Sequence, residues 1–207
     1  MKLYFSPGAC SLSPHIVLQE AGYAFHLEKV DLKSHRTHAG VALATVSGKN
    51  YVPILELDDG QQLTEGPVIV QYLADGRPEA DLIPKSGTFE RYRVQEWLNF
   101  ITSELHKTFT PLFHRAEISK DWQDASETKL AGRFEWLSAQ LDGRGYLMGE
   151  RFTVADAYLF TVLNWCNFVG LDLKRWPTLD AYVARVAARP AVQRAMKAEG
   201  LRVKAAA

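Results

Sequence analysis

The sequence contains only two cysteines, Cys10 and Cys166, and has no excess of charge of either sign. Because two cysteines so far apart do not form a disulfide framework, we expect two thiols in a reducing, cytoplasmic setting. Lysine plus arginine and aspartate plus glutamate each number 24, which gives a net charge of zero. We therefore expect neither nucleic acid nor a membrane as a partner.

Long apolar runs are also missing. No segment approaches the roughly 20 apolar residues that cross a bilayer, and the opening residues MKLYFSPGAC lack the apolar core of a signal peptide. His35 and His38 have no neighbouring cysteine or histidine that would complete a metal shell, and no zinc or phosphate-loop motif is present. A hydrophobic content of 47% still suits a folded core, so we expect a soluble protein without a metal.

The first part of the chain alternates between strand and helix patterns. Short aromatic and β-branched runs predict strands, and runs with helical spacing predict helices. The expected order is strand, helix, strand, a loop or short helix, two strands joined by the turn Asp58-Asp59-Gly60, and a helix. The strands fall at residues 2–5, 25–31, 54–57 and 61–64, and the helices end at Gly22 and Gly76.

The second part is helical throughout. Apolar residues recur there at helical spacing, and residues 153–156 (TVAD) form a capping box ahead of an apolar run that predicts a buried helix. The first apolar stripe consists of Val94, Leu98, Ile101, Leu105 and Leu112. Two prolines and a glycine mark residues 77–87 as a linker. We predict a small α/β domain at residues 1–77, a linker at 78–87 and an all-helical domain at 88–207.

Cys10 is the first candidate for chemistry. It lies between a strand and the start of a helix, where backbone N–H groups and the helix dipole favour an anion and lower a thiol pKa. The pattern is Cys-x-x-Ser, which points to an external thiol as partner because no second cysteine lies in the same turn. The alternative is a small buried residue at a helix start. Cys166, in an apolar run, is expected to be an inert core thiol.

Two motifs near residue 60 suit a peptide-like ligand. A cis peptide at Val52-Pro53 would turn the Val52 backbone outward, where it could pair with an extended peptide. Glu65-Gly66 stands at a helix start, so free N–H groups could bind an α-carboxylate while the Glu65 carboxylate binds an ammonium. The alternatives are a plain loop proline and a residue that caps the helix.

The helix that starts near Phe89 carries a polar strip opposite its apolar stripe. Its members are Asn99, Ser103, His106 and Lys107, spaced as neighbours on one helical face. Hydrogen-bond donors of this kind favour a face turned into a cleft, where His106 could donate to a thiolate and Lys107 could balance its charge. The alternative is an ordinary solvated face.

These motifs together resemble a known family. Val52-Pro53, residues 64–66 (TEG) and the capping box are similar to those of cytosolic glutathione transferases. Residues 6–12 (SPGACSL), 97–99 (WLN), 104–107 (ELHK) and 152–160 (FTVADAYLF) resemble the bacterial beta class in particular. The likeness extends from Met1 to about Gly200 over both predicted domains.

The resemblance implies a thioredoxin-like N-terminal domain, an all-α C-terminal domain and a homodimer. Glutathione would be the co-substrate, with no other cofactor, and a small hydrophobic electrophile would be the second substrate. Cys10 and His106 would be the catalytic residues. The implied glutathione-binding residues are Cys10, His35, Val52, Glu65, Gly66, Asn99, Ser103, His106 and Lys107.

The sequence departs from the family pattern at three places. The family's tyrosine before the first loop is replaced, since the order here is Tyr4-Phe5, and the hydroxyl moves to the other face of the strand. His35 stands where the family commonly has a lysine that reaches the glycine carboxylate. The usual Asn-Pro-x-Gly before Val-Pro is absent from residues 46–51 (VSGKNY).

The resemblance predicts that the enzyme conjugates glutathione to electrophiles in detoxification, with thiol–disulfide exchange at Cys10 as a further reaction. One alternative is a glutathione-dependent thiol transferase or reductive dehalogenase that works through a mixed disulfide at Cys10. Another is a non-catalytic protein of the same fold that binds ligands or partners.

Overall fold

The computed structural model describes residues 1–201 of the chain, and these residues divide into two compact units. The first unit contains Met1–Ile83 together with residues 187–201, and the second contains Pro84–Val186. Among residues 1–201, no helix is both long and apolar enough to span a membrane.

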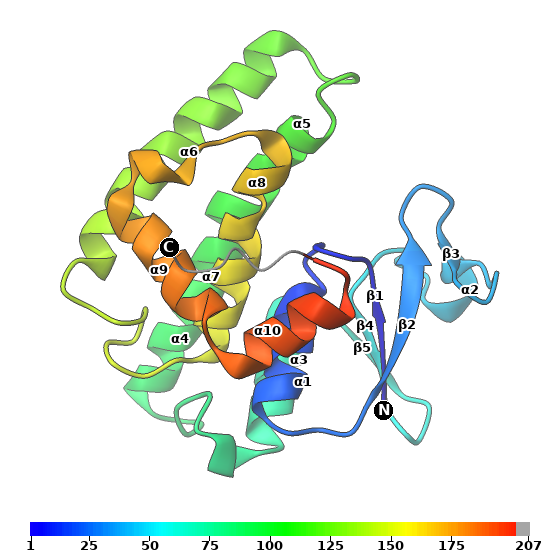
Figure 1. The fold of residues 1–207 in the computed structure, drawn as a ribbon. Coiled ribbons are helices and arrows are strands. Elements are labelled where there is room, and N and C mark those ends of the chain that lie inside the picture. The colour runs from blue at the N-terminus through cyan, green and yellow to red at the C-terminus, as the bar shows by residue number, and fades with distance from the viewer. Residues whose placement is uncertain (202–207) are drawn as a thin grey trace. The chain divides into compact units, whose positions relative to one another are not determined.

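A five-stranded sheet forms the centre of the first unit (Figure 1). The strands are β1 (Lys2–Phe5), β2 (His26–Asp31), β3 (Arg36–Thr37), β4 (Ile54–Glu56) and β5 (Gln62–Thr64), in the spatial order β3-β2-β1-β4-β5. β1 runs parallel to β2 and antiparallel to β4, so that Leu3 faces both Leu27 and Leu55 across the ladders. The parallel pair requires a crossover, which a helix supplies.

Four helices belong to this sheet: α1 (Leu12–Glu20), α2 (Leu43–Val46), α3 (Gly66–Asp75) and α10 (Pro190–Ala198). α1 packs against both α3 and α10, although α10 comes from the far end of the chain (Figure 1). α2 lies beside β3 at the outer edge of the sheet. The side of the core nearest α2 contains Tyr4, Val30, Leu43, Val52 and Ile54.

The expected order of elements in the α/β part is observed, with two additions. The two-residue strand β3 lies in the polar stretch after Asp31, where period-2 apolar alternation is lacking. α10 joins the first unit through packing, a relationship that the order of residues along the chain does not reveal. Both predicted helix ends are observed. Gly22 follows α1 with a φ of 68°, and Gly76 is the C-terminal cap of α3.

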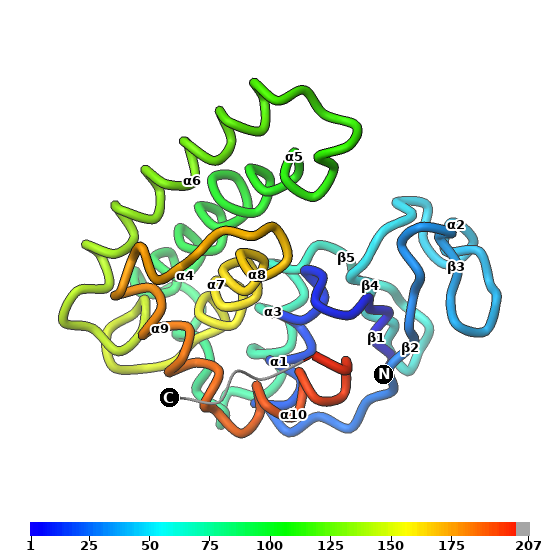
Figure 2. The backbone as a smooth tube through the Cα atoms, turned by 45° about the horizontal axis from the view of Figure 1, so that its top comes forward, coloured from blue at the N-terminus to red at the C-terminus, as the bar shows by residue number. Residues whose placement is uncertain are grey.

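The second unit is helical and contains α4 (Phe89–Phe100), α5 (Thr110–Phe113), α6 (Lys120–Leu141), α7 (Val154–Asn164), α8 (Cys166–Val169) and most of α9 (Pro177–Ala187). Figure 2 shows α7 in the midst of the other helices, and all of its residues are buried. The apolar stripe from Val94 to Leu112 is buried as expected.

The predicted capping box opens α7. The Asp156 carboxylate accepts hydrogen bonds from the Thr153 backbone N–H (2.8 Å) and hydroxyl (3.0 Å). It also accepts bonds from the Leu147 N–H and the Tyr182 hydroxyl, both at 2.9 Å. Burial raises the pKa of Asp156, and the four hydrogen bonds oppose that rise. The box therefore fixes the start of α7, the preceding loop and α9 through one side chain.

The predicted linker at residues 78–87 begins with a 3-10 turn, Pro78–Ala80, and ends at Gly87, whose φ is 84°. The two compact units divide within this stretch, between Ile83 and Pro84. The units follow packing, whereas the boundaries 1–77 and 88–207 follow the order of elements. Those boundaries stay a prediction.

Candidate functional site

Cys10 lies in the turn between β1 and α1, as expected. Backbone hydrogen bonds from Ala9 N to Ser6 O and from Leu12 N to Ala9 O, both 3.0 Å, close this turn. The Cys10 side chain is partly exposed, and its thiol donates to the Val52 backbone oxygen at 3.4 Å. Two of the predicted site residues are therefore in contact.

Two further contacts fix the Cys10 turn. The Ser11 hydroxyl donates to Ser6 O at 3.2 Å and accepts from Ser6 N at 3.1 Å. The Gly8 N–H donates to a Glu199 carboxylate oxygen at 2.9 Å, and the other oxygen of Glu199 bonds His15 Nδ1 at 2.8 Å. Gly8 has a φ of 72°, a conformation that favours glycine. The residue after α10 thus holds the loop that presents the thiol.

Residues 49–52 connect the other predicted site residues of the first unit. The Lys49 ammonium and the Tyr51 hydroxyl donate to Glu65 Oε1 at 2.6 Å and 2.7 Å. The Asn50 backbone oxygen bonds His35 Nδ1 at 3.1 Å. Together with the Cys10–Val52 contact, these bonds place Cys10, His35 and Glu65 around one short segment.

The backbone of this segment combines the cis peptide considered from the sequence with a left-handed residue that the sequence did not indicate. The Val52-Pro53 peptide bond is cis, and Asn50 adopts a φ of 55°. Asparagine tolerates this left-handed region better than most residues do, so Asn50 serves where glycine is otherwise favoured. The absence of the usual Asn-Pro-x-Gly motif therefore does not prevent a left-handed turn ahead of Val52.

Glu65 immediately precedes α3 and has an unusual conformation. Its φ is 68° and its ψ is 108°, values that cost a non-glycine residue free energy and that cluster at ligand-binding sites. Its side chain does not cap the helix, and its backbone oxygen instead accepts from Val68 N and Ile69 N, both at 2.9 Å. The exposed Glu65 carboxylate is therefore displayed at a helix start, beside the buried Gly66. This geometry suits a zwitterionic ligand.

The Tyr4 hydroxyl already has a hydrogen-bond partner in the first unit. It donates to Glu56 Oε2 at 3.0 Å, and the Lys2 ammonium lies 3.1 Å from the other oxygen of Glu56. Burial is the main cause that raises the pKa of Tyr4, and the bond to Glu56 raises it further. Tyr4 is therefore a poor candidate for activating a thiol, in agreement with the expectation from the order Tyr4-Phe5.

The second group of predicted site residues spans the end of α4, where the helix changes pitch, with Asn99 in its last turn and Ser103, His106 and Lys107 beyond it. α4 gives way to a π-helical turn at Ile101–Leu105 and then to a 3-10 turn at His106–Phe109. The expectation of one regular helix through Lys107 is therefore wrong beyond Phe100. π-Helical turns within helices are frequent at functional sites.

His106 points towards α7. Its Nδ1 lies 2.6 Å from the Tyr158 hydroxyl, and its ring meets the Trp165 ring edge-on at a centroid distance of 4.7 Å. Asn99, Ser103 and Lys107 remain exposed on their side of the helix. Tyr158 belongs to a run that the sequence marked as a buried helix, so its part in holding His106 carried no separate signal.

More aromatic side chains extend this cluster. Phe109 and Phe113 lie 5.6 Å and 5.4 Å from Trp165 between ring centroids. Phe113 is 45% exposed, and Phe168 on α8 is 53% exposed. The surroundings of His106 within the second unit are therefore aromatic and partly open to solvent.

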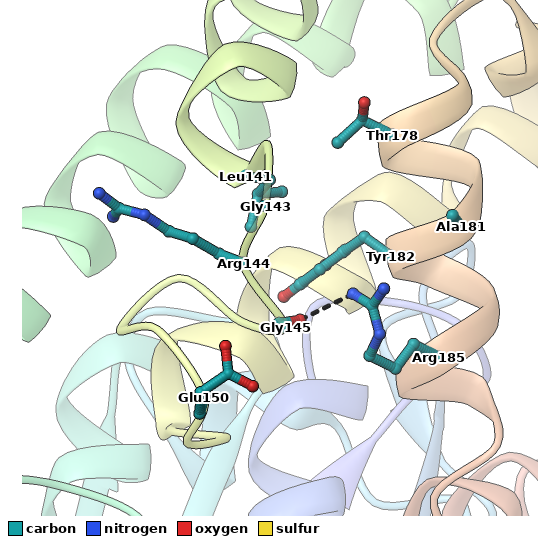
Figure 3. Close-up of a pocket in the computed structure, with 9 residues that line it drawn as sticks. All are labelled: Leu141, Gly143, Arg144, Gly145, Glu150, Thr178, Ala181, Tyr182 and Arg185. Carbon is teal, nitrogen blue, oxygen red and sulfur yellow. Dashed lines mark hydrogen bonds between the residues drawn. The ribbon is translucent and has the colours of Figure 1, made fainter.

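A separate pocket of about 400 Å³ lies elsewhere in the second unit (Figure 3). The Arg185 guanidinium donates to Gly145 O at 2.9 Å across it, and Tyr182 lies beside this bond. The pocket also contains Arg144 and Glu150. None of the predicted site residues lines this pocket, and the Arg185 bond is structural because it ties the loop after α6 to α9.

In the part of the chain that the structure describes, the remaining cysteine and the acidic groups form no metal site. Among residues 1–201, no three His, Cys, Asp or Glu side chains gather in a way that would hold a metal ion. Cys166 is buried, and burial raises the pKa of its thiol to about 12. As expected, Cys166 is an unreactive core residue at neutral pH.

Family comparisons agree with this architecture. The family model "Glutathione S-transferase, N-terminal domain" matches residues 8–75, and "Glutathione S-transferase, C-terminal domain" matches residues 100–190. Glutathione S-transferase GstA of Escherichia coli O157:H7 is 45% identical over 98% of this chain and 100% of its own.

Solved structures extend the comparison to the whole fold. BphK, a bacterial glutathione transferase solved as a ternary complex, is 53% identical, with a TM-score of 0.95 over 97% of this chain and 100% of its own. The beta-class enzyme of Sphingomonas chungbukensis is 46% identical, with a TM-score of 0.93 over 98% and 100%. A thioredoxin-like unit joined to a helical unit is therefore the fold.

The chain belongs to the glutathione S-transferase family. It is a transferase that uses glutathione as its co-substrate, and its similarity to a beta-class structure supports that class. The predicted fold class, family and enzyme class are thereby confirmed.

Proposed function

We propose that the enzyme conjugates glutathione to small hydrophobic electrophiles, as in detoxification, through the nine residues named above. In the first unit, Cys10 contacts the glutathione sulfur, the Val52 backbone pairs with the cysteinyl part, and Glu65 and Gly66 hold the γ-glutamyl end. His35 binds the glycine carboxylate. Asn99, Ser103, His106 and Lys107 complete the site. The observation that carries the proposal is the convergence of Cys10, Glu65 and His35 on residues 49–52.

The proposed chemistry is thiolate attack. The bound thiol loses its proton to water, the sulfur forms a bond to an electrophilic carbon, and the leaving group departs with its electron pair. Hydrogen bonds and positive charge at the sulfur make the thiolate available at neutral pH. His106 is suited to this role because Tyr158 and Trp165 hold its ring in place.

The aromatic cluster supports a hydrophobic second substrate. Phe113 and Phe168 are exposed although both are large and apolar, and Trp165 links Phe113 to His106. Planar aromatic electrophiles can stack on such side chains, which contributes roughly 0.5–1.5 kcal/mol per pair beyond burial.

The test is an ultraviolet titration of bound glutathione. His106→Ala is expected to raise the pKa of the bound thiol by about 1–2 units, because a hydrogen bond to a charged group is worth about 1.5–3 kcal/mol. His114→Ala is the matched control, since His114 is an exposed histidine of the same unit that pairs with Glu117. An unchanged thiol pKa in His106→Ala would remove His106 from the mechanism.

A second reaction, thiol–disulfide exchange, is favoured by the exposure of Cys10. A mixed disulfide between Cys10 and glutathione would also serve a thiol transferase or a reductive dehalogenase. The partly exposed Cys10 thiol contrasts with the buried Cys166. Mass spectrometry after incubation with oxidised glutathione should show one adduct, which Cys10→Ser should abolish. Full conjugating activity in Cys10→Ser would assign that activity to the other residues.

The exposed apolar side chains support a homodimer. Val68 and Tyr72 on α3 and Phe89 and Tyr92 on α4 are each at least 45% exposed, although large apolar residues are usually buried. A cytoplasmic location agrees with the two thiols. Light scattering should give twice the chain mass, and Tyr92→Glu should shift the mass towards that of the monomer if α4 is part of the interface.

A further inference from the structure

Lys49 and Tyr51 both donate to one oxygen of Glu65. The Lys49 ammonium lies 2.6 Å and the Tyr51 hydroxyl 2.7 Å from Glu65 Oε1. The Lys49 ammonium also lies 6.0 Å from the centre of the Tyr51 ring, within range of a cation–π interaction. The ammonium thus has two neighbours that favour its charge, and the bond to Glu65 is the main cause that raises the pKa of Lys49.

The ammonium of Lys49 is chemically equivalent to the amino group of a γ-glutamyl residue. Both carry one positive charge and three N–H donors, and both are satisfied by a carboxylate. The Glu65 oxygen that Lys49 and Tyr51 contact already accepts two short hydrogen bonds. An incoming ammonium that bonds to this oxygen must therefore compete with the ammonium of Lys49.

We propose that Lys49 is an internal competitor for the amino group of glutathione, so that binding of the tripeptide exchanges one ammonium for another at Glu65. This inference rests on the proposed role of Glu65 and adds a specificity residue to it. Lys49 lowers the affinity for ligands that carry the amino group and leaves the affinity for ligands without it unchanged. The amino group of glutathione therefore contributes less to binding than it would if Lys49 did not contact the Glu65 carboxylate.

The ion pair between Lys49 and Glu65 lies at the surface, where its two side chains can separate. The Lys49 and Glu65 side chains are 47% and 49% exposed, so Lys49 can return to water when it leaves the carboxylate. Exposed ion pairs are weak because water solvates both partners well. Val52, which ends the same segment, is 5% exposed and belongs to the core, so the segment stays anchored while the Lys49 side chain moves.

Calorimetric titration of the full-length protein tests the proposal with two ligands. One is glutathione, and the other is the analogue in which a glutaryl group replaces the γ-glutamyl group and thus removes only the amine. Lys49→Met should bind glutathione about two- to fivefold more tightly than the wild type, the range expected when an exposed ion pair no longer competes. Its affinity for the analogue should equal that of the wild type.

Two further variants provide controls. Lys49→Arg keeps the positive charge and should bind both ligands as the wild type does. Lys197→Met removes an exposed lysine of the last turn of α10 and should change neither affinity. Weaker glutathione binding by Lys49→Met, or an equal change for both ligands, would overturn the proposal. Absence of glutathione binding by the wild type would instead refute the proposed function.

Discussion

His15 and Glu199 are joined by a hydrogen bond of 2.8 Å although 184 residues separate them in the sequence. Both side chains are completely buried, and the second oxygen of Glu199 accepts from the Gly8 N–H at 2.9 Å. Glu199, the residue after α10, therefore connects that helix to α1 and to the turn that carries Cys10 through one carboxyl group. This relationship makes the C-terminal cap of α10 part of the structural support for the thiol.

Replacing Glu199 with alanine should destabilise the first unit. The change leaves the Gly8 N–H and His15 Nδ1 without their buried acceptor, and each such loss costs roughly 1–3 kcal/mol. We expect urea unfolding to show a decrease of about 2–4 kcal/mol, and hydrogen exchange at Gly8 to accelerate more than exchange at β1. Glu79→Ala is the control, because Glu79 makes only an exposed contact of 3.5 Å with Arg77. Equal stability of the two variants would contradict the assigned role.

The two thiols should differ sharply in reactivity. Burial raises the pKa of Cys166 to about 12, so almost none of it is thiolate at neutral pH, whereas Cys10 is partly exposed. A thiol-specific disulfide reagent should react with one equivalent of thiol in the native protein and with two after unfolding. Cys10→Ser should remove the native reaction, and Cys166→Ala should preserve it. A fast native reaction in Cys10→Ser would show that Cys166 becomes accessible through local opening.

Asp156 should contribute much of the stability of the second unit. Its carboxylate accepts four hydrogen bonds from Leu147, Thr153 and Tyr182 while completely buried. Asp156→Ala should therefore lower the free energy of unfolding by about 3–5 kcal/mol, because several buried donors lose their acceptor. Tyr182→Phe removes only one of the donors and should cost about 1 kcal/mol in the same urea titration. A loss in Asp156→Ala no greater than that in Tyr182→Phe would disprove this account.

Much of the fold was predictable because its signals are local. The strand pattern at β1, the turn at Gly60 and the capping box at Thr153 each depend on residues within a few positions of one another. The packing of α10 onto α1 has no such local signal, since the His15–Glu199 contact joins opposite ends of the chain. β3 is only two residues long, too short to show a periodic pattern.

The candidate site was predictable in its residue types more than in its contacts. Cys10, Val52 and Glu65 each stand at a junction of elements, where sequence motifs are recognisable. The contacts of Lys49 and Tyr51 with Glu65 depend on the left-handed turn at Asn50, which the departure from the family motif concealed. Likewise, helical spacing could not predict the π-helical turn before His106, because such a turn departs from the regular helical period.

Stability should depend on pH through Glu104, which lies in that π-helical turn. Arg133 donates to its carboxylate at 2.6 Å and 3.0 Å, and hydrogen bonds from Arg133 and then Lys129 lower the pKa of Glu104. A lowered folded-state pKa gives stability that is present above the unfolded-state pKa and is lost as the pH falls through the folded-state value. Glu104→Gln should thus be less stable than the wild type at pH 7, by at most about 1 kcal/mol, because the pair is only partly buried.

The difference between Glu104→Gln and the wild type should disappear on acidification. Urea unfolding at pH 7 and at a series of lower pH values measures it, because the wild-type carboxyl group takes up its proton as the pH falls through its lowered folded-state pKa. Glu117→Gln is the control, since the exposed Glu117 side chain lies 3.5 Å from His114 in the same unit. A difference that persists unchanged in acid would assign the stability to packing instead of charge.

Tyr158→Phe should test whether the orientation of His106 matters for catalysis. The Tyr158 hydroxyl lies 2.6 Å from His106 Nδ1, and its loss leaves the imidazole held only by its contact with Trp165 and its remaining neighbours. If His106 stabilises the glutathione thiolate, misorientation should reduce kcat about tenfold, the equivalent of one lost hydrogen bond, with a smaller change in KM for glutathione. The pKa of the bound thiol should rise in parallel. Tyr182→Phe is the matched control, because it removes a buried tyrosine hydroxyl from the same unit without touching His106. Steady-state kinetics that show the same loss in both variants would indicate that Tyr158 acts only through stability.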